Sequence, residues 1–195
     1  MKIYTKTGDK GTSSLYNGER RAKDNLVFDA LGSVDELSSC IGIANEHCQS
    51  AKNGLEDKLF EIQCVLIEMG SNIATPRQSS ADAPYKLEKT AFPDIHVSTL
   101  ESWIDTLDAQ LPALTNFILP SGGLAAVHLH QCRSVARRAE RVLIPLVTSS
   151  EVDEAVGKYL NRLSDFFFVA ARFAAKHEGK IERVFKQKRV VEREL

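Results

Sequence analysis

Three stretches of the sequence repeat apolar residues every three or four positions, and this repeat constrains the fold more than any other feature. The stretches are 55–73, 128–146 and 156–174. Their average spacing of about 3.5 residues is typical of the packing seam between helices in a left-handed bundle. The repeat therefore predicts at least three long helices that share one core.

Two further helices fit the pattern less strictly, at 24–48 and 98–111. Thr75-Pro76 and Pro112 are expected to end helices, because proline disfavours helical geometry in the residue before it. Ser150 or Asp153 can cap the last helix. Only 2–5 and 116–119 look extended. We predict an all-α fold, a five-helix up-and-down bundle with a four-helix left-handed core, as a single domain over 1–195.

The composition narrows the classes of function. A net charge of −1 over 195 residues gives no general affinity for nucleic acid. The longest uncharged stretch, 109–132, contains prolines and glycines and is no membrane span. The four cysteines form no C-x-x-C pair and are expected to be buried free thiols in a reducing compartment.

The first 23 residues are predicted to form a polar loop that suits an anion. Gly8 and Gly11 are too close together for the phosphate loop of the Walker type. Even so, glycines let backbone N–H groups converge, and Lys6 and Lys10 supply positive charge. A polar loop without function remains an alternative at this point.

Arginines form a second cluster, in CRSVARRAER. Arg133, Arg137 and Arg141 lie at i, i+4 and i+8 on the expected fourth helix, with Arg138 beside them and Glu140 as a compensating charge. One interpretation, without any function, is a solvated basic face of the helix. The functional interpretation is that these guanidinium groups bind phosphate or carboxylate in a bidentate manner.

Some polar and histidine residues of the expected helices also bear on function. Asn161 and Asp165 lie one turn apart beside apolar phenylalanines and need polar partners. No histidine has an acidic residue three positions before it, which excludes the di-iron pattern of helical bundles. We expect His128, His130 and Cys132 to pack rather than bind metal, because the three side chains do not converge on a helix.

Residues 76–96 form an irregular segment with three prolines and no periodicity. A long segment of this kind is usually functional or disordered, so a binding lid and plain disorder both remain open.

Five motifs together resemble one family. TKTGDKGTSSL, GSVDELSSCIG, FILPSGG, CRSVARRAER and YLNRLSDFFFVAARFAA are similar to the PduO-type ATP:cob(I)alamin adenosyltransferases, most of all to animal mitochondrial forms. The resemblance implies a homotrimer with active sites at the subunit interfaces. It also implies an enzyme that transfers the 5′-deoxyadenosyl group of ATP to the cobalt of cob(I)alamin and releases triphosphate, with Mg²⁺ bound mainly through the ATP phosphates.

The resemblance also assigns site residues. It implies an ATP site within the N-terminal loop 1–23, on the later arginine motif and on the last helix: Thr5, Lys6, Thr7, Gly8, Asp9, Lys10, Gly11, Thr12, Ser13, Ser14, Lys23, Arg137, Arg138, Glu140, Arg141 and Asn161. The residues implied for cobalamin are Asp35, Phe117, Arg133 and Phe168. The catalytic residues implied are Asp35, Phe117, Arg133 and Arg137.

Within this set, the resemblance gives Asp35 and Arg133 the role of an ion pair between neighbouring subunits, and Phe117 that of an aromatic ring lining the lower face of the cobalt.

The resemblance further implies partners and a location. These are a cobalamin-dependent mutase and a protein that delivers or reduces cobalamin, with no nucleic acid and no membrane. The expected location is the mitochondrial matrix after removal of a presequence, or otherwise the cytoplasm. The charged tail 187–195 is expected to be flexible. The alternative function is a non-catalytic carrier that binds ATP and corrinoid and delivers the cofactor to a mutase.

Overall fold

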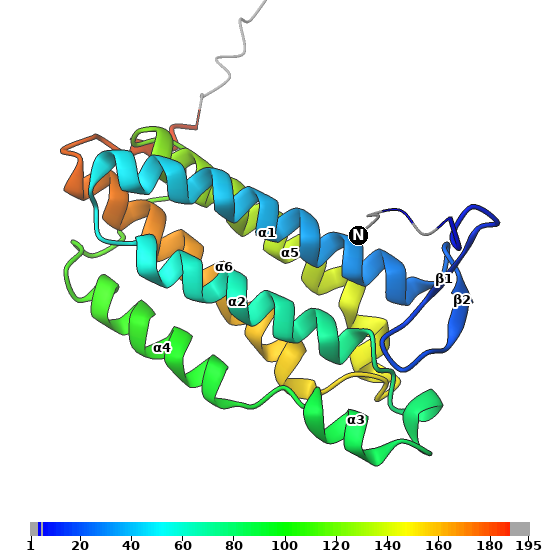
Figure 1. Cartoon of the computed structure of the whole chain (residues 1–195). Coiled ribbons are helices and arrows are strands. Elements are labelled where there is room, and N and C mark those ends of the chain that lie inside the picture. Colours follow the sequence, from blue (N-terminus) through cyan, green and yellow to red (C-terminus); the bar gives the residue numbers. More distant parts are fainter. Residues whose placement is uncertain (1–3, 5, 188–195) are drawn as a thin grey trace, which may run out of the picture.

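The computed structural model describes residue 4 and residues 6–187, and six α-helices dominate them (Figure 1). The long ones are α1 (Leu26–Ala51), α2 (Glu56–Ile73), α4 (Ile95–Asp108), α5 (Leu124–Thr148) and α6 (Glu154–His177). A short α3 (Pro84–Lys89) follows the single 3-10 turn η1 (Gln78–Ser80). Most of the expected strand 2–5 and of the expected tail lies outside the described residues.

Two small antiparallel sheets stand at opposite ends of the helices. In the first, β1 (Thr12–Ser14) pairs with β2 (Arg20–Ala22) in a hairpin that precedes α1. In the second, β3 (Ile118–Leu119) pairs with β4 (Arg183–Val184), which joins the loop before α5 to the segment after α6.

Helix α5 packs against both α1 and α6, while α2 lies along α1 and α4 lies along α6 (Figure 1). Helices α1 and α5 are antiparallel. Near one end, the ring of His47 stacks on that of His128 with centroids 4.7 Å apart, and halfway along, Glu36 pairs with Arg138. The hairpin before α1 therefore lies beside the C-terminal end of α5.

The apolar repeats form the core, as their spacing predicted. Every residue of the repeat in α2 is buried: Leu55, Leu59, Ile62, Leu66, Met69 and Ile73. The repeat in α6 is equally buried, at Val156, Leu160, Leu163, Phe167, Ala170 and Ala174. Each such side chain contributes roughly 1.5–3 kcal/mol through removal from water, which holds the helices together.

The structure corrects the expected elements in three places. The described residues have six α-helices rather than five, because the irregular segment 76–96 contains α3 and the start of α4. Helix α4 ends at Asp108, four residues before Pro112. Asp153 does stand at the N-cap of α6, but its carboxylate makes no capping bond and is used elsewhere. No helix among the described residues is long and apolar enough to cross a membrane.

Candidate functional site

The N-terminal loop folds back on itself ahead of the hairpin. Gly11 N donates to Gly8 O at 3.2 Å, and Lys23 N donates to Gly11 O at 2.9 Å. Gly11 has a φ of 75°, a left-handed value that glycine adopts at little cost. These bonds bring both glycines of the motif and Lys23 into one compact turn.

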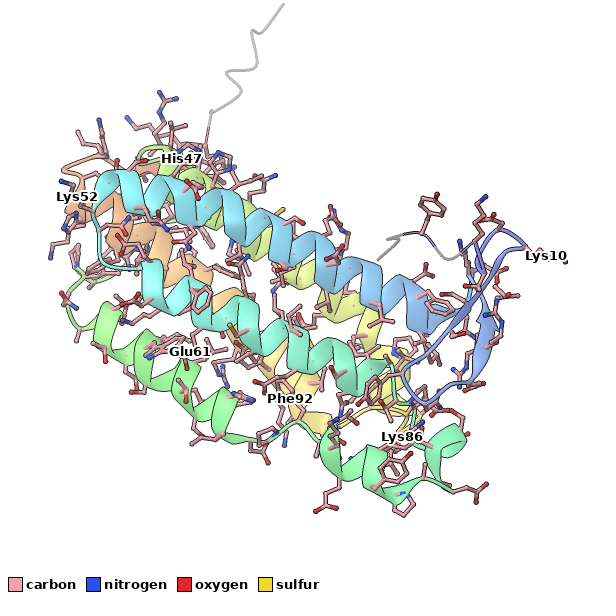
Figure 2. All side chains as sticks on the ribbon, in the orientation of Figure 1. Lys10, His47, Lys52, Glu61, Lys86 and Phe92 are labelled. Carbon is pink, nitrogen blue, oxygen red and sulfur yellow. The ribbon has the colours of Figure 1, made fainter. Side chains whose placement is uncertain are left out.

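Lys23 reaches directly across this loop. A Cβ atom placed on Gly8 would lie 3.1 Å from the Lys23 ammonium nitrogen, so the end of the lysine side chain lies close against Gly8. Lys10 stands at the outer tip of the same loop (Figure 2). The resemblance assigned Lys6, Lys10 and Lys23 to ATP, and all three lie in the described part of this N-terminal region, while Thr5 lies outside the described residues.

Arg20, on β2, holds the loop in shape, and sequence reasoning missed it. Its Nη2 donates to Thr7 O at 2.9 Å and to Thr12 Oγ1 at 2.6 Å, and its Nη1 donates to Ser14 Oγ at 3.0 Å. Since the hydroxyl oxygens act as acceptors here, their protons are still available to an anion. The only signal in the sequence was an arginine a few residues after a glycine- and hydroxyl-rich loop.

Of the predicted arginine stripe on α5, Arg137 and Arg141 form an exposed face together with Arg138, while Arg133 is partly buried. Arg137 and Arg141 are exposed and form no ion pair with any described residue, while Arg141 Nη1 donates to Arg137 O at 3.2 Å. Arg138 instead pairs with Glu36 of α1. Two guanidinium groups are therefore left with most of their donors available on this face.

Glu140 and Asn161 connect this face to α6. Asn161 Nδ2 donates to Glu140 Oε1 at 2.9 Å. The expectation that Glu140 would compensate Arg137 is thus not what the structure shows, because the carboxylate turns to the neighbouring helix. Asp165, the other polar residue predicted to need a partner, accepts from Arg162 at 3.2 Å.

Arg133 lies deeper, one turn nearer the start of α5. It is partly buried, and its Nε has no hydrogen-bond partner among the described residues. The neighbouring His130 is 4% exposed and packs edge-on against the ring of Phe168 at 6.0 Å. Burial, together with the positive charge of Arg133, lowers the pKa of His130 to about 4. His130 is therefore neutral near pH 7, and it packs as expected.

Asp35 does not face the arginines within its own chain. It lines a groove between α1 and α2, together with Leu66 and Gly70 of α2. The acidic residue of α1 that does reach α5 is its neighbour Glu36. An ion pair between Asp35 and Arg133 is thus absent from the described residues of a single chain.

Phe117 is the most exposed aromatic side chain of the site residues, at 86%. Its carbonyl accepts from Phe185 N at 2.8 Å, which fixes the loop to the strand β4. Residues 114–117 line an apolar surface cavity of about 220 Å³. A ring this exposed in a fixed loop is poorly explained as core filling, because it buries little area of its own chain.

Phe117 and the N-terminal loop lie at opposite ends of the chain's helices. The loop of Phe117 leads into the N-terminus of α5, and the hairpin lies beside its C-terminus. Helix α5 has 25 residues and is therefore about 37 Å long at roughly 1.5 Å per residue. His47 and Lys10 mark the two ends in Figure 2. One chain alone does not bring these two parts of the predicted site together.

Metal ligands are not clustered. No group of three or more His, Cys, Asp or Glu residues in the described part of the chain could hold a metal ion.

The four cysteines are free thiols, of which Cys48 and Cys132 are buried and Cys64 is exposed. Burial raises the pKa of the Cys48 thiol to about 11, which makes it unreactive at neutral pH.

Comparisons with known proteins agree with one another. The sequence profile of a family described as cobalamin adenosyltransferase matches residues 3–174. Corrinoid adenosyltransferase MMAB of Mus musculus is 52% identical over 95% of this chain and 78% of its own length, and that of Homo sapiens is 51% identical over 94% and 73%. A corrinoid adenosyltransferase of Bacillus subtilis is 43% identical over 92% of this chain and 89% of its own.

Solved structures show the same likeness. A variant of a PduO-type ATP:corrinoid adenosyltransferase from Lactobacillus reuteri, complexed with cobalamin and ATP, superposes with a TM-score of 0.85. It is 35% identical and covers 95% of this chain and 100% of its own. The likeness therefore extends over nearly the whole chain.

Proposed function

The chain belongs to the cobalamin adenosyltransferase family, and we propose that its N-terminal loop and its arginine face together bind the triphosphate of ATP during adenosyl transfer. The enzyme transfers the 5′-deoxyadenosyl group of ATP to the cobalt of cobalamin. The main support for assigning these residues to triphosphate is the exposed face of α5. There, Arg137 and Arg141 have no acidic partner among the described residues.

The reaction places a simple demand on the protein. Reduced cobalt attacks the C5′ carbon of the ribose, a cobalt–carbon bond forms, and the C5′–oxygen bond breaks with its electron pair leaving on triphosphate. Charge therefore grows on the phosphate chain in the transition state. Preorganised positive groups stabilise such a charge, and holding C5′ in line with cobalt lowers the entropic part of the barrier.

Each part of the candidate site has a place in this scheme. The loop with Gly8, Gly11 and Lys23 offers the Lys23 ammonium group to the triphosphate, while the amides of Gly11 and Lys23 keep the loop folded by donating to its own carbonyls. Arg137 and Arg141 add guanidinium groups. Because the described residues contain no metal cluster, we expect Mg²⁺ to be held by the phosphate oxygens rather than by a protein cage.

Phe117 acts on the cobalt side. An apolar ring placed at the lower face of the corrin excludes water and bases from the fifth ligand position. Loss of that donor makes cob(II)alamin easier to reduce. The high exposure of Phe117 in a loop fixed by Phe185 supports this role, because the ring is available to a ligand from outside the chain.

A homotrimer would complete the site. Since Phe117 and the N-terminal loop lie about a helix length apart in one chain, a neighbouring copy must supply one of them. Exposed apolar side chains on α1 and α2, among them Ile43, Phe60 and Ile67, offer a surface for such a neighbour. In the trimer, the Asp35 of one copy would meet the partly buried Arg133 of the next. Light scattering after gel filtration tests the assembly, and a monomeric active enzyme would contradict it.

The decisive experiment measures triphosphate and adenosylcobalamin formed from ATP and chemically reduced cobalamin. We expect both products in equal amounts, and their loss in the Arg137→Ala variant. The alternative of a non-catalytic carrier predicts binding of both substrates without triphosphate. The comparisons do not favour a carrier, because the relatives are themselves named as transferases.

The product and its location complete the proposal. Adenosylcobalamin would pass to a cobalamin-dependent mutase, and a separate protein would deliver or reduce the incoming cobalamin. The likeness to animal relatives supports action in the mitochondrial matrix. Fractionation of cells that express the tagged protein from its natural gene would test that location.

A further inference from the structure

The sequence left a lid and disorder open for the segment 76–96, and its first part, 76–92, is bonded to the helices at its far end. Asp153 Oδ2 accepts from Phe92 N at 2.8 Å and from Asn72 Nδ2 at 2.9 Å. Asn72 Nδ2 also donates to Thr90 O at 2.8 Å. Asn72 is 6% exposed, and with Thr90 and Asp153 it lines a cavity of about 240 Å³, so these bonds lie in the wall of that cavity and are largely shielded from solvent.

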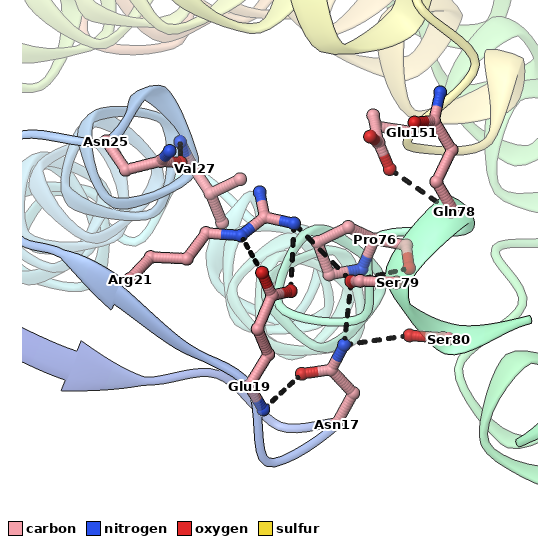
Figure 3. A network of polar contacts seen from close by, with 10 residues as sticks. All are labelled: Asn17, Glu19, Arg21, Asn25, Val27, Pro76, Gln78, Ser79, Ser80 and Glu151. Atoms are coloured by element: carbon pink, nitrogen blue, oxygen red, sulfur yellow. Dashed lines mark hydrogen bonds and ion pairs between the residues drawn. The ribbon is translucent and has the colours of Figure 1, made fainter. Parts of the chain in front are cut away.

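The near end of the segment contacts the N-terminal hairpin through Asn17. Asn17 lies in the turn between β1 and β2, and its Nδ2 donates to Ser79 Oγ and to Ser80 Oγ, both at 3.0 Å (Figure 3). Its backbone carbonyl accepts from Lys86 Nζ of α3 at 2.9 Å. Segment 76–92 is therefore hydrogen-bonded to the hairpin through both the side chain and the backbone carbonyl of Asn17.

A second pair strengthens the same contact. Glu19 and Arg21 form a two-point ion pair at 2.8 and 2.9 Å, and Arg21 Nη2 lies 3.4 Å from Ser79 Oγ (Figure 3). Glu19 N donates to Asn17 Oδ1 at 2.9 Å. Both polar atoms of the Asn17 side chain are thus engaged, and the hairpin turn has little freedom to swing.

From this geometry we propose that Asn17 and Lys86 are positioning residues that hold the ATP loop at its place relative to the arginine face. The proposal rests on the proposed function, in which that loop binds triphosphate. The chain from Asn17 to Ser14 is only three residues long, so a displacement of the turn carries the loop with it. Fixing the loop before ATP arrives lowers the ordering cost of binding. Segment 76–92 is in this sense a support for the site rather than a lid over it.

The test compares two lysines of the same short helix. Lys86→Met removes the bond to Asn17 O, while Lys89→Met removes an equal charge from a side chain that bonds to no described residue. We expect the KM for ATP to rise about tenfold in Lys86→Met and to stay within about twofold in Lys89→Met. The kcat at saturating ATP and the KM for cobalamin should change by less than about twofold in both. Lys86→Arg should restore most of the affinity for ATP.

A second variant approaches the same contact from the hairpin. Asn17→Asp keeps the size of the side chain but removes the two bonds donated to the serines, and it should also raise the KM for ATP. Identical kinetics for Lys86→Met and Lys89→Met would overturn the proposal. A general loss of kcat together with a lowered melting temperature in Lys86→Met would also overturn it, since that pattern belongs to a structural role alone.

Two further variants separate this inference from the function on which it rests. If Lys23→Ala and Arg137→Ala lose affinity for ATP while Lys86→Met does not, the site stands and the positioning role is wrong. If Lys23→Ala and Arg137→Ala also leave the KM for ATP unchanged, the assignment of the loop and the arginine face to ATP is itself wrong.

Discussion

Asn161 on α6 donates a hydrogen bond of 2.9 Å to Glu140 on α5, in the middle of the arginine face. This bond directs the single carboxylate of the motif toward α6 and away from Arg137. A carboxylate paired with Arg137 would compete with a phosphate for the same guanidinium group. The relationship between Glu140 and Asn161 thus explains how a helix can carry an acid among its arginines and still offer a cationic surface.

Arg137→Ala is expected to weaken ATP binding without unfolding the chain. One lost hydrogen bond to a charged group corresponds to roughly 1.5–3 kcal/mol, or about a 10- to 100-fold lower kcat/KM for ATP. The side chain is exposed, so the free energy of unfolding should change by less than about 0.5 kcal/mol. Steady-state kinetics and urea denaturation measure the two effects. Lys158→Ala is a suitable control, because that exposed lysine pairs with no described residue other than the nearby Glu154.

The long helices could be predicted from the sequence because burial alone determines them. Leu59, Leu66 and Phe167 recur at the spacing of a helix face, and each is fully buried as expected. The same logic placed Arg137 and Arg141 on one face of α5, which is exposed, but it did not predict that Arg133 of the same stripe is partly buried. These features follow from periodicity, which needs no knowledge of what the helix packs against.

The short elements could not be predicted, because contacts distant in sequence determine them. Strand β1 has three residues, too few for an alternating pattern, and Arg20 holds it. Helix α3 has six residues, and Pro84 at its first turn was its only local signal. The sequence predicted Asp153 as a helix N-cap. Its carboxylate instead accepts a hydrogen bond from the backbone N–H of Phe92, sixty-one positions away.

Phe117→Ala is expected to impair the reaction of cobalamin while leaving the binding of ATP nearly unchanged. The KM for ATP should stay within about twofold, because the Phe117 ring offers neither a charge nor a hydrogen-bond donor to the triphosphate. Adenosylation that starts from cob(II)alamin should slow by more than tenfold, since the fifth ligand would no longer be excluded. Electron paramagnetic resonance of bound cob(II)alamin checks the cause. An unaltered four-coordinate signal in Phe117→Ala would contradict the proposed role.

Asp35 and Arg133 are expected to act as a pair across two copies of the chain. Asp35→Asn and Arg133→Ala should each lower kcat/KM for cobalamin, and the double variant should lose less than the sum, with a coupling of about 0.5–3 kcal/mol. Since no contact joins the two side chains within the described part of one chain, mixed assembly gives a sharper test. Trimers made from the two single variants together contain some intact pairs and should regain part of the activity. No recovery, with negligible coupling, would remove the pair from the site.

His130 is expected to make stability depend on pH below neutrality. Its pKa in the folded chain is about 4, below the value of about 6.5 expected after unfolding, so the unfolded chain binds a proton first. The corresponding stability is fully present above pH 6.5 and is lost as the pH falls toward 4. Between pH 7 and pH 5 the loss should be about 2 kcal/mol for this one group.

Urea denaturation of the wild-type chain and of His130→Gln at the two pH values isolates this contribution from that of the carboxylates, which both proteins share. His130→Gln should be less stable at pH 7, because it disturbs the contact with Phe168, but its stability should fall less between pH 7 and pH 5. Equal falls in the two proteins would show that His130 is already charged in the folded chain. A charge there would lie beside Arg133, and the packing of these two residues would then need a counter-ion that the described residues do not supply.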